Sequence, residues 1–366
     1  MGHIAILGAG QIGRAAFQIL NDLKISSNNY LIADSWITIY DSNKDNLSLV
    51  KSTFALEMDL TNLSVDEISG YFKSHNVTHI INALPFFLNE KVAQAAVKVG
   101  CSYIDFTEDD IMADKVQEIF KDSGLTCVVK CGLAPGFINY LGTSLIKKID
   151  KPESLVVGVG ALPRSVAYDA NHPEDSYNLT WSVDGLVNEY IKPCRVRKNG
   201  NILEVPALTD LTKVIIDGTE YEAALTSGGI GSLVKDLTNV PNVHYMTLRY
   251  PGHYEYVKTL IDYSHDFDVL KDMFLKKFSY TDDDVIIVYG KATGKDKNNN
   301  NICRSYSTKF YGVDGLTAIQ STTASAGVAV LELILNETIT GIVNHIDIPL
   351  QSFMNTLSFK KYYNQG

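Results

Sequence analysis

Three glycines follow a short apolar run near the N-terminus, in the order G-x-G-x-x-G. The run covers residues 3–7, and a helical pattern is predicted over residues 14–23. Gly8 would allow a tight turn, Gly10 would let the backbone approach a pyrophosphate, and Gly13 would let the helix pack closely on the strand. The N–H groups at the start of that helix would attract phosphate. We predict a dinucleotide site here, the alternative being a glycine turn that binds nothing. The predicted site comprises Gly8, Gly10, Gln11, Ile12 and Gly13.

A carboxylate follows the second apolar run, residues 35–40. At this strand end Asp41 would accept hydrogen bonds from an adenosine ribose and repel a 2′-phosphate. The run comes late in the chain, which a loop insertion over residues 25–34 would explain. Asp41 therefore favours NAD, although Lys44 nearby would also suit NADP. The alternative is a turn aspartate with no ligand.

Later strand ends are predicted to face the same ligand, because ligands bind at the carboxyl ends of parallel strands. Residues 54–60 are predicted to form a third strand, with Asp59 near the adenine. A buried strand over residues 79–85 breaks at its proline. A strand–turn–helix junction follows residue 131, with its helix beginning near Asn139 and its turn against the nicotinamide. The further cofactor residues predicted at this edge are Asn82, Ala83, Leu84, Pro135 and Gly136.

Composition limits the class of protein. The 366 residues, 45% of them hydrophobic, allow one large domain or two ordinary ones. The formal net charge of −10 argues against nucleic acid or an anionic membrane surface as the main partner. We expect neither a signal peptide nor an apolar run of about 18 residues. The five cysteines, an odd number without C-x-x-C, are expected to be reduced thiols in a cytoplasmic protein, and no metal site is predicted.

The chain changes character after its first third. Residues 1–134 alternate short strands and helices, which predicts an α/β Rossmann domain with a doubly wound parallel sheet. Residues 135–315 carry longer strands and hairpins, and predict a second α/β substrate and dimerisation domain with a mixed or antiparallel sheet. One predicted hairpin has the asparagine run at 298–301 as its tip. Residues 316–366, which begin with a helix to Leu335, are expected to pack back on the first domain.

Five motifs in this order resemble the saccharopine dehydrogenase family. They are GAGQIG at 8–13, GLAPGFIN at 132–139, YNLTWSVDG at 177–185, TSGG at 226–229 and TLRYPGH at 247–253. The resemblance implies a Rossmann domain with an α/β substrate domain, a nicotinamide cofactor, a commonly dimeric state, and redox chemistry at a carbon–nitrogen bond of amino-acid-like substrates.

One departure from the family pattern concerns the substrate. Where saccharopine reductases carry an arginine that grips a carboxylate, this chain has Asp184, which would attract an amine. The chain is in this respect similar to members of the lysine 6-dehydrogenase type, and Trp181, Thr226 and Ser227 become predicted substrate contacts. The alternative is that Asp184 caps a helix beginning at Gly185.

The resemblance also suggests roles for three further residues. Arg249 would bind the substrate α-carboxylate, or else form a structural ion pair. His253 would shuttle a proton or donate a hydrogen bond to substrate, or else be structural. Asp105 would accept the amine proton or fix the ammonium, or else be a turn residue. The predicted reaction is NAD-dependent oxidation of a lysine ε-amine, faster above neutral pH. Saccharopine dehydrogenase, a carboxynorspermidine-type dehydrogenase and a non-catalytic NAD-binding module are the alternatives.

Overall fold

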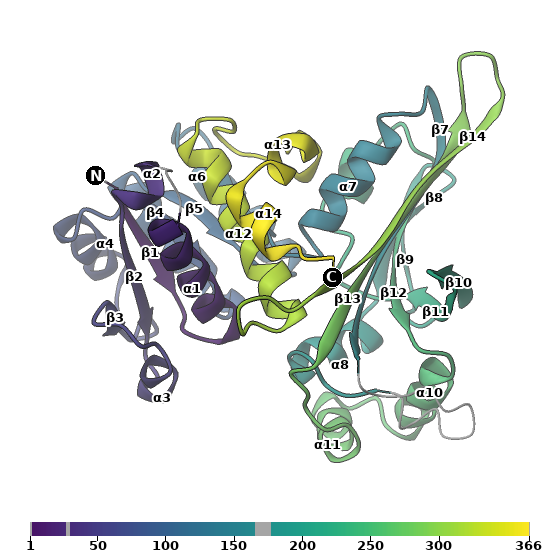
Figure 1. Ribbon diagram of the computed structural model, residues 1–366, viewed down its shortest axis with the longest axis horizontal. Helices are drawn as coiled ribbons and strands as arrows, with labels where there is room; N and C mark the ends of the chain where they lie inside the picture. The colour runs from purple at the N-terminus through teal and green to yellow at the C-terminus, as the bar shows by residue number, and fades with distance from the viewer. Residues whose placement is uncertain (1, 27–29, 165–176, 366) are drawn as a thin grey trace. The chain divides into compact units, whose positions relative to one another are not determined.

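The computed structural model describes residues 2–26, 30–164 and 177–365 (Figure 1). The described chain divides into two compact units. Unit 1 contains residues up to Phe137 together with Gln320–Tyr363, and unit 2 contains Ile138–Ile319 and the last residues from Asn364.

Unit 1 is built on a six-stranded parallel sheet in the order β3-β2-β1-β4-β5-β6. The chain leaves β1 toward β2 and later returns to the other side of β1 with β4, so the direction of strand order reverses beside β1. Ligands bind at such a reversal in doubly wound sheets. The predicted parallel α/β sheet is confirmed. The strands are β1 His3–Leu7, β2 Trp36–Asp41, β3 Ala55–Glu57, β4 His79–Asn82, β5 Ser102–Asp105 and β6 Cys127–Val128.

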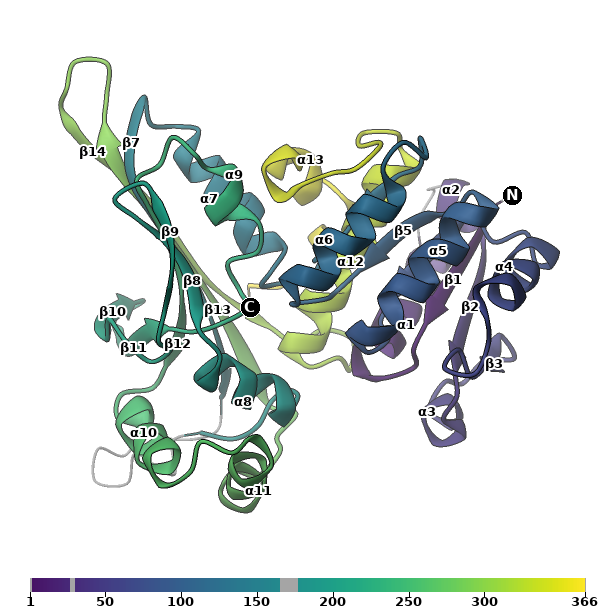
Figure 2. The ribbon, with the colours of Figure 1, turned by 180° about the vertical axis from the view of Figure 1, so that it is seen from behind.

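Helices cover both faces of this sheet, with α1 and α12 on one face in Figure 1 and α5 and α6 on the other in Figure 2. Apolar side chains from α4, α5 and α6 pack on strand residues such as Leu7, Ile80 and Tyr103 to form a buried core. The helices of this unit are α1 Gln11–Ser26, α2 Tyr30–Ala33, α3 Lys44–Ser48, α4 Val65–Ser74, α5 Asn89–Val99, α6 Asp110–Phe120, α12 Ala318–Leu335, α13 Leu350–Met354 and α14 Leu357–Tyr362.

Some local predictions were wrong. The predicted loop at 25–34 is partly helical, because α1 continues to Ser26 and α2 follows; residues 27–29 lie outside the described residues. The predicted strand at 54–60 is only the three residues of β3. An apolar helix of 18 residues also exists: α12 has a mean hydropathy of 1.4, long and apolar enough to cross a membrane. Because 78% of it is buried within the protein, a core position accounts for its composition.

Unit 2 is built on a mixed eight-stranded sheet whose main path is β10-β11-β12-β7-β13-β14, with β8 pairing with β12 and β9. Among the strands of the described part of this unit, β12 and β7 pair in parallel and the others antiparallel. β13 and β14 form the predicted hairpin, with its tip at residues 296–300. The strands are β7 Lys151–Pro163, β8 Cys194–Lys198, β9 Asn201–Val205, β10 Thr212–Ile216, β11 Thr219–Leu225, β12 Asn242–Arg249, β13 Asp284–Lys295 and β14 Asn301–Tyr311.

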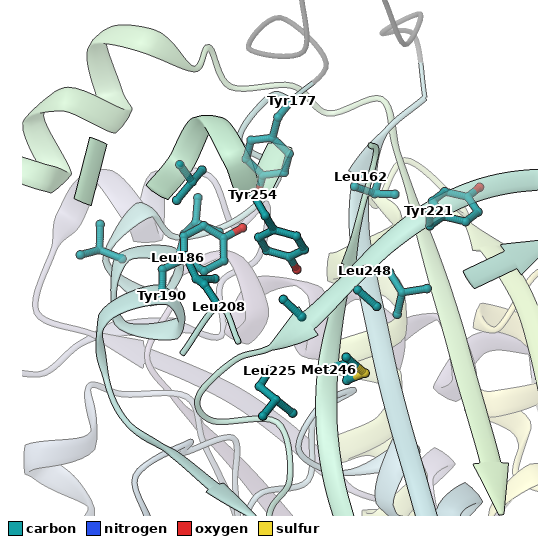
Figure 3. Close-up of a cluster of buried hydrophobic side chains, with 14 of the residues drawn as sticks. Leu162, Tyr177, Leu186, Tyr190, Leu208, Tyr221, Leu225, Met246, Leu248 and Tyr254 are labelled. Atoms are coloured by element: carbon teal, nitrogen blue, oxygen red, sulfur yellow. The ribbon is translucent and has the colours of Figure 1, made fainter. Parts of the chain in front are cut away.

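Helices of unit 2 contribute a second core. Figure 3 shows Tyr177, Tyr190 and Tyr254 within this buried cluster, with Leu248 of β12 nearby. The helices are α7 Phe137–Ile146, which begins at the last residue of unit 1, α8 Val183–Ile191, α9 Leu233–Asp236, α10 His253–Tyr263 and α11 Phe267–Lys277. The predicted substrate motifs of unit 2 therefore adjoin a core that contains large aromatic side chains.

The cysteines are all free thiols. Cys101, Cys127, Cys131 and Cys194 are buried, and Cys303 on β14 is exposed. Burial raises the pKa of the Cys101 and Cys194 thiols to about 12, so both stay protonated and inert near neutral pH.

Candidate functional site

The glycine turn has the close contacts that its spacing predicts. Gly8 has a φ of 95°, and a Cβ there would lie 2.7 Å from the carbonyl oxygen of Ala83. A Cβ on Gly13 would lie 1.8 Å from the carbonyl oxygen of Gly8. Gly10 differs, because a Cβ there would meet no atom of the described residues within 4 Å. The first and third glycines are therefore required by packing, whereas the second faces open space where a pyrophosphate would lie.

The start of α1 lies directly at this turn. The helix begins at Gln11, which is exposed, and Ile12 follows half-buried. No acidic side chain occupies its first turn. The first N–H groups of a helix have no partner within the helix and carry a partial positive charge. Gln11 and Ile12 are thus placed where the cofactor prediction needs them.

Asp41 ends β2 beside the glycine turn. Its Oδ2 accepts a hydrogen bond from the backbone N–H of Ala9 at 2.6 Å, and its Oδ1 accepts one from the N–H of Asn43 at 2.7 Å. The side chain is half-buried and keeps a face toward solvent. Lys44, the cation that would suit a 2′-phosphate, lies 3.3 Å from Glu57 in an exposed ion pair. The carboxylate is fixed beside the glycine turn, the nearby cation has a carboxylate partner, and the ribose contact stays a prediction.

Asp59 lies in a turn beyond β3. Its oxygens accept hydrogen bonds from the N–H of Thr61 at 2.9 Å and from Asn62 at 2.6 Å. The Thr61 hydroxyl also donates to Asp59, and this bond first, followed by the Thr61 N–H, lowers the pKa of the exposed Asp59 carboxyl. The structure places it as a turn-capping residue, with the adenine contact still a prediction.

The ends of β4 and β5 form a buried polar network. Asn82 donates to Asn89 and to the Tyr103 hydroxyl, each at 2.9 Å, and accepts from the N–H of Leu84 at 3.3 Å. Tyr103 and Asn89 in turn donate to Asp105 Oδ2, at 3.0 and 3.1 Å. Asn82 therefore fixes the turn that contains Ala83 and Leu84, and those two residues are half-buried.

Asp105 is fully buried within this network. Its Oδ1 accepts from the N–H groups of Thr107 at 3.1 Å and Lys130 at 2.9 Å. Desolvation raises the pKa of the carboxyl to about 6, against the lowering effect of these bonds. All four acceptor positions are engaged by groups of unit 1. Asp105 thus joins three chain segments, and the predicted contact with a substrate amine finds no support in this arrangement.

The junction after β6 is a tight turn built on a glycine. The peptide bond from Ala134 to Pro135 is cis, and Gly136 has a φ of 135°. A Cβ on Gly136 would lie 1.9 Å from the carbonyl oxygen of Gly132. Helix α7 begins at Phe137, two residues before the predicted Asn139. Pro135 and Gly136 are buried, and both shape the start of that helix.

In unit 2, Arg249 is buried at the end of β12. Its Nη2 lies 3.3 Å from Glu189 Oε2, its Nε donates to the Tyr190 hydroxyl at 2.8 Å, and its Nη1 donates to the carbonyl of Leu248 at 3.0 Å. The guanidinium also lies over the ring of Tyr177, 5.2 Å from its centroid. The residue is only 1% exposed. The ion pair that was the alternative for Arg249 is therefore present, and a substrate carboxylate would have to share this cation.

His253 joins the same cluster at the start of α10. Its Nε2 lies 2.9 Å from the Tyr190 hydroxyl, and its ring packs 4.6 Å from that of Tyr177. Desolvation, and secondly the charge of Arg249, hold the pKa of His253 well below its usual range. These effects favour the neutral imidazole over the imidazolium. A neutral imidazole donates one hydrogen bond through one ring nitrogen and accepts one at the other.

Asp184 lies in the first turn of α8. The cap of this helix is Ser182, whose hydroxyl accepts from the N–H of Gly185 at 3.3 Å, so the alternative that Asp184 is the cap was wrong. Asp184 Oδ1 is 2.7 Å from Lys271 of α11, and its side chain is 51% exposed. Trp181 packs on the same turn, where a Cβ on Gly185 would lie 2.3 Å from its ring.

The TSGG segment connects to this cluster. The Thr226 hydroxyl lies 2.5 Å from that of Thr247, and the N–H of Ser227 donates to the carbonyl of Glu189 at 3.0 Å. Thr226 is buried and Ser227 half-buried. Thr247 also donates to Glu189 Oε1 at 3.2 Å. Predicted substrate residues from two motifs therefore meet at Glu189.

Three buried polar atoms near the cluster have no strong hydrogen bond to another described residue, and two of them belong to Tyr177 and Trp181, which contact each other. They are Tyr177 Oη, Thr180 Oγ1 and Trp181 Nε1. Buried polar groups are nearly always paired in native proteins. Tyr177 and Trp181 lie close enough to be weak partners of each other, and the substrate contacts in the YNLTWSVDG segment stay a prediction.

Sequence reasoning missed Glu189 and Tyr190, although both lie on the helix predicted after Gly185. A signal was available. A glutamate on a mostly apolar helix is expected to be buried, and a buried carboxylate needs a cation. Arg249 was a cation for which the sequence had suggested no carboxylate within the protein.

Two family models match this chain. The model for the saccharopine dehydrogenase C-terminal domain matches residues 132–359, and the model for the saccharopine dehydrogenase NADP binding domain matches residues 4–128. The chain belongs to the saccharopine dehydrogenase family. The resemblance drawn from the five motifs is confirmed, and the glycine turn and Asp41 lie within the NAD(P)-binding domain of this family.

Individual relatives agree with the family. A saccharopine dehydrogenase [NADP(+), L-glutamate-forming] of Saccharomyces cerevisiae is 24% identical over 274 residues, 70% of this chain and 58% of the relative. The match thus spans little more than half the length of that curated relative. The solved apo structure of saccharopine dehydrogenase (L-Glu forming) from the same yeast has a TM-score of 0.76 at 16% identity, covering 98% of each chain. A homospermidine synthase of Legionella pneumophila, solved with NAD, has a TM-score of 0.66 at 13% identity, covering 99% of this chain and 90% of the other. Both structures share the fold.

Proposed function

We propose that this protein is an NAD(P)-dependent oxidoreductase that acts on the C–N bond of a lysine-like amino acid, removing the ε-amine oxidatively. The single observation that carries the redox part is the glycine turn, which leaves open space at Gly10 while Gly8 and Gly13 are closed by packing. A bound nicotinamide would accept the hydride, so no protein nucleophile is needed.

The residues fit the cofactor in two ways. The first N–H groups of α1 would hold the pyrophosphate, and Asp41 would bind the ribose hydroxyls. Asp41 supports NAD as the preferred form, because its carboxylate would repel a 2′-phosphate; the pair of Lys44 with Glu57 is exposed and weak. Leu84, Pro135 and Gly136 are proposed to face the nicotinamide.

The substrate end is proposed to lie in unit 2. The half-exposed carboxylate of Asp184 supports an amine substrate, because its exposed pair with Lys271 is weak and can exchange partners. Arg249 directs three of its five N–H groups to described residues of the protein, so an α-carboxylate could take up the other two. Neutral His253 and the hydroxyls of Thr226 and Ser227 would orient the substrate. Proton loss from the ammonium would then depend on alkaline solvent.

Glutamate-forming saccharopine dehydrogenase activity is the second candidate, favoured by the yeast relative. A carboxynorspermidine-type activity and a non-catalytic NAD-binding module are further alternatives. A homodimer and a cytoplasmic location are proposed from the family resemblance alone.

The first experiment follows the absorbance of reduced nicotinamide at alkaline pH, with lysine and saccharopine in parallel and with NAD and NADP each tested. Turnover of lysine with NAD supports the proposal. Turnover of saccharopine alone refutes the lysine assignment. A protein that cofactor protects from heat, with no turnover and no further shift from amino acids, would be the non-catalytic module.

A further inference from the structure

Glu189 is the acidic side chain at the centre of the unit 2 cluster. One carboxylate oxygen lies 3.3 Å from Arg249, and the other accepts from Thr247 at 3.2 Å. Its side chain is 11% exposed, and Arg249 is almost completely buried. The helix α8 brings Glu189 to this position together with Tyr190, the other partner of the guanidinium.

The pair determines the charge that a ligand meets. A buried guanidinium alone presents one positive charge in a medium where electrostatic effects are strong, whereas an ionised Glu189 brings the sum near zero. Burial raises the pKa of the Glu189 carboxyl to about 7, so the neutralisation is complete only in alkaline solution, where the substrate and glutarate measurements are made. Lysine has one carboxylate, while saccharopine has three. A neutralised cluster would therefore attract the second less than an unpaired Arg249 would.

We propose that Glu189 is a specificity-determining residue, which disfavours substrates with additional carboxylates by neutralising Arg249. The proposal rests on the proposed function, since it concerns the substrate of the same site.

Two observations place Glu189 among the predicted substrate residues. Its carbonyl accepts from Ser227 and its carboxylate is bonded to the Thr247 hydroxyl, which itself contacts Thr226. The hydroxyl of Tyr177, whose ring lies over Arg249, is buried, and a side-chain hydrogen bond with Trp181 partly opposes the rise in its pKa that burial causes. A ligand that reaches this hydroxyl would also lie within the field of the ion pair.

The test compares the wild type with Glu189→Gln. Glutamine keeps the size, an acceptor for Arg249 and a donor for the Thr247 hydroxyl, but removes the charge. We expect the ratio of kcat/KM for saccharopine to that for lysine to rise by about tenfold or more. Calorimetry with glutarate, a dicarboxylate probe that needs no turnover, should show about tenfold tighter binding to the variant. Glu189→Asp keeps the charge and should retain the wild-type ranking of substrates.

Glu220→Gln is the matched control, because Glu220 forms an exposed pair with Lys213 in the same unit and its loss changes the net charge equally. The proposal is overturned if Glu189→Gln, folded by its thermal melt, binds glutarate as the wild type does, or if Glu220→Gln changes binding as much. If the wild type turns over neither amino acid, the proposed function fails, while the glutarate measurement still decides the role of Glu189.

Discussion

Asp41 and Ala9 are joined by a hydrogen bond from the backbone N–H of Ala9 to Asp41 Oδ2, at 2.6 Å. The carboxylate that would bind the ribose thereby also fixes the turn that would bind the pyrophosphate. Two parts of the proposed cofactor site, 32 residues apart in the chain, are held in a single geometry.

Asp41→Asn should weaken NADH binding by about tenfold and NADPH binding less, because the amide removes the charge that repels a 2′-phosphate. Fluorescence titration with both reduced cofactors measures the two Kd values. Asp59→Asn is the control, since Asp59 lies in an exposed turn. Equal losses for the two cofactors would contradict a role for Asp41 in discriminating between them.

Alanine at Gly10 and at Gly13 should have different consequences. Gly13→Ala places a Cβ 1.8 Å from the Gly8 carbonyl, so α1 must shift, and we expect both a lower Tm and loss of cofactor binding. Gly10→Ala meets no atom of the described residues within 4 Å, so the Tm should hold while the methyl blocks the pyrophosphate. Thermal melts with and without NAD separate the two effects. A Gly10→Ala protein that NAD still stabilises fully would mean that the pyrophosphate lies elsewhere.

Much of unit 1 could be predicted because its signals are local. The spacing of Gly8, Gly10 and Gly13 and the carboxylate at Asp41 each depend on a short stretch of chain, and the six-stranded parallel sheet follows from alternating strands and helices. The length of β3 and the helical character of residues 30–33 were missed, because short elements depend on tertiary contacts more than on pattern.

The site in unit 2 was harder to predict, because its partners are distant in sequence. Arg249 meets Glu189 across 60 residues, and Asp184 meets Lys271 across two helices. A single sequence indicates that a buried arginine needs a carboxylate partner, but it does not identify which acidic residue lies beside it. The five motifs identified the family, while the burial of Asp105 and the pairing of Arg249 required coordinates.

Asp105→Asn tests whether that residue is structural. The amide would turn a donor toward groups that already donate. The free energy of unfolding, measured in urea, should therefore be about 1–3 kcal/mol lower than that of the wild type. A catalytic role would instead lower kcat at unchanged stability. Asp109→Asn, which alters the cap of the neighbouring helix α6, controls for general effects of a lost aspartate.

The pH dependence of stability should separate Asp105 from other groups. Burial raises the pKa of its carboxyl from 3.8 to about 6 in the folded protein. Between these values the folded state binds more protons than the unfolded state, so the Asp105 contribution to stability falls as pH rises through this window. Urea titrations from pH 4 to pH 7 should show that slope reduced in Asp105→Asn. An unchanged slope would mean that the carboxyl titrates normally.

His253 should make the protein less stable as the pH falls, which is the opposite of the effect of Asp105. Its pKa lies well below the usual 6.5, because burial and the Arg249 charge disfavour the imidazolium. Below pH 6.5 the unfolded state binds more protons, so the stability that neutral His253 provides is present above pH 6.5 and is lost as the solution is acidified. His253→Gln should flatten this acid limb while leaving the alkaline rise of kcat/KM at the same pH. If the substitution moved the alkaline limb, the histidine would be exchanging the substrate proton, and the proton-shuttle role would replace the structural one.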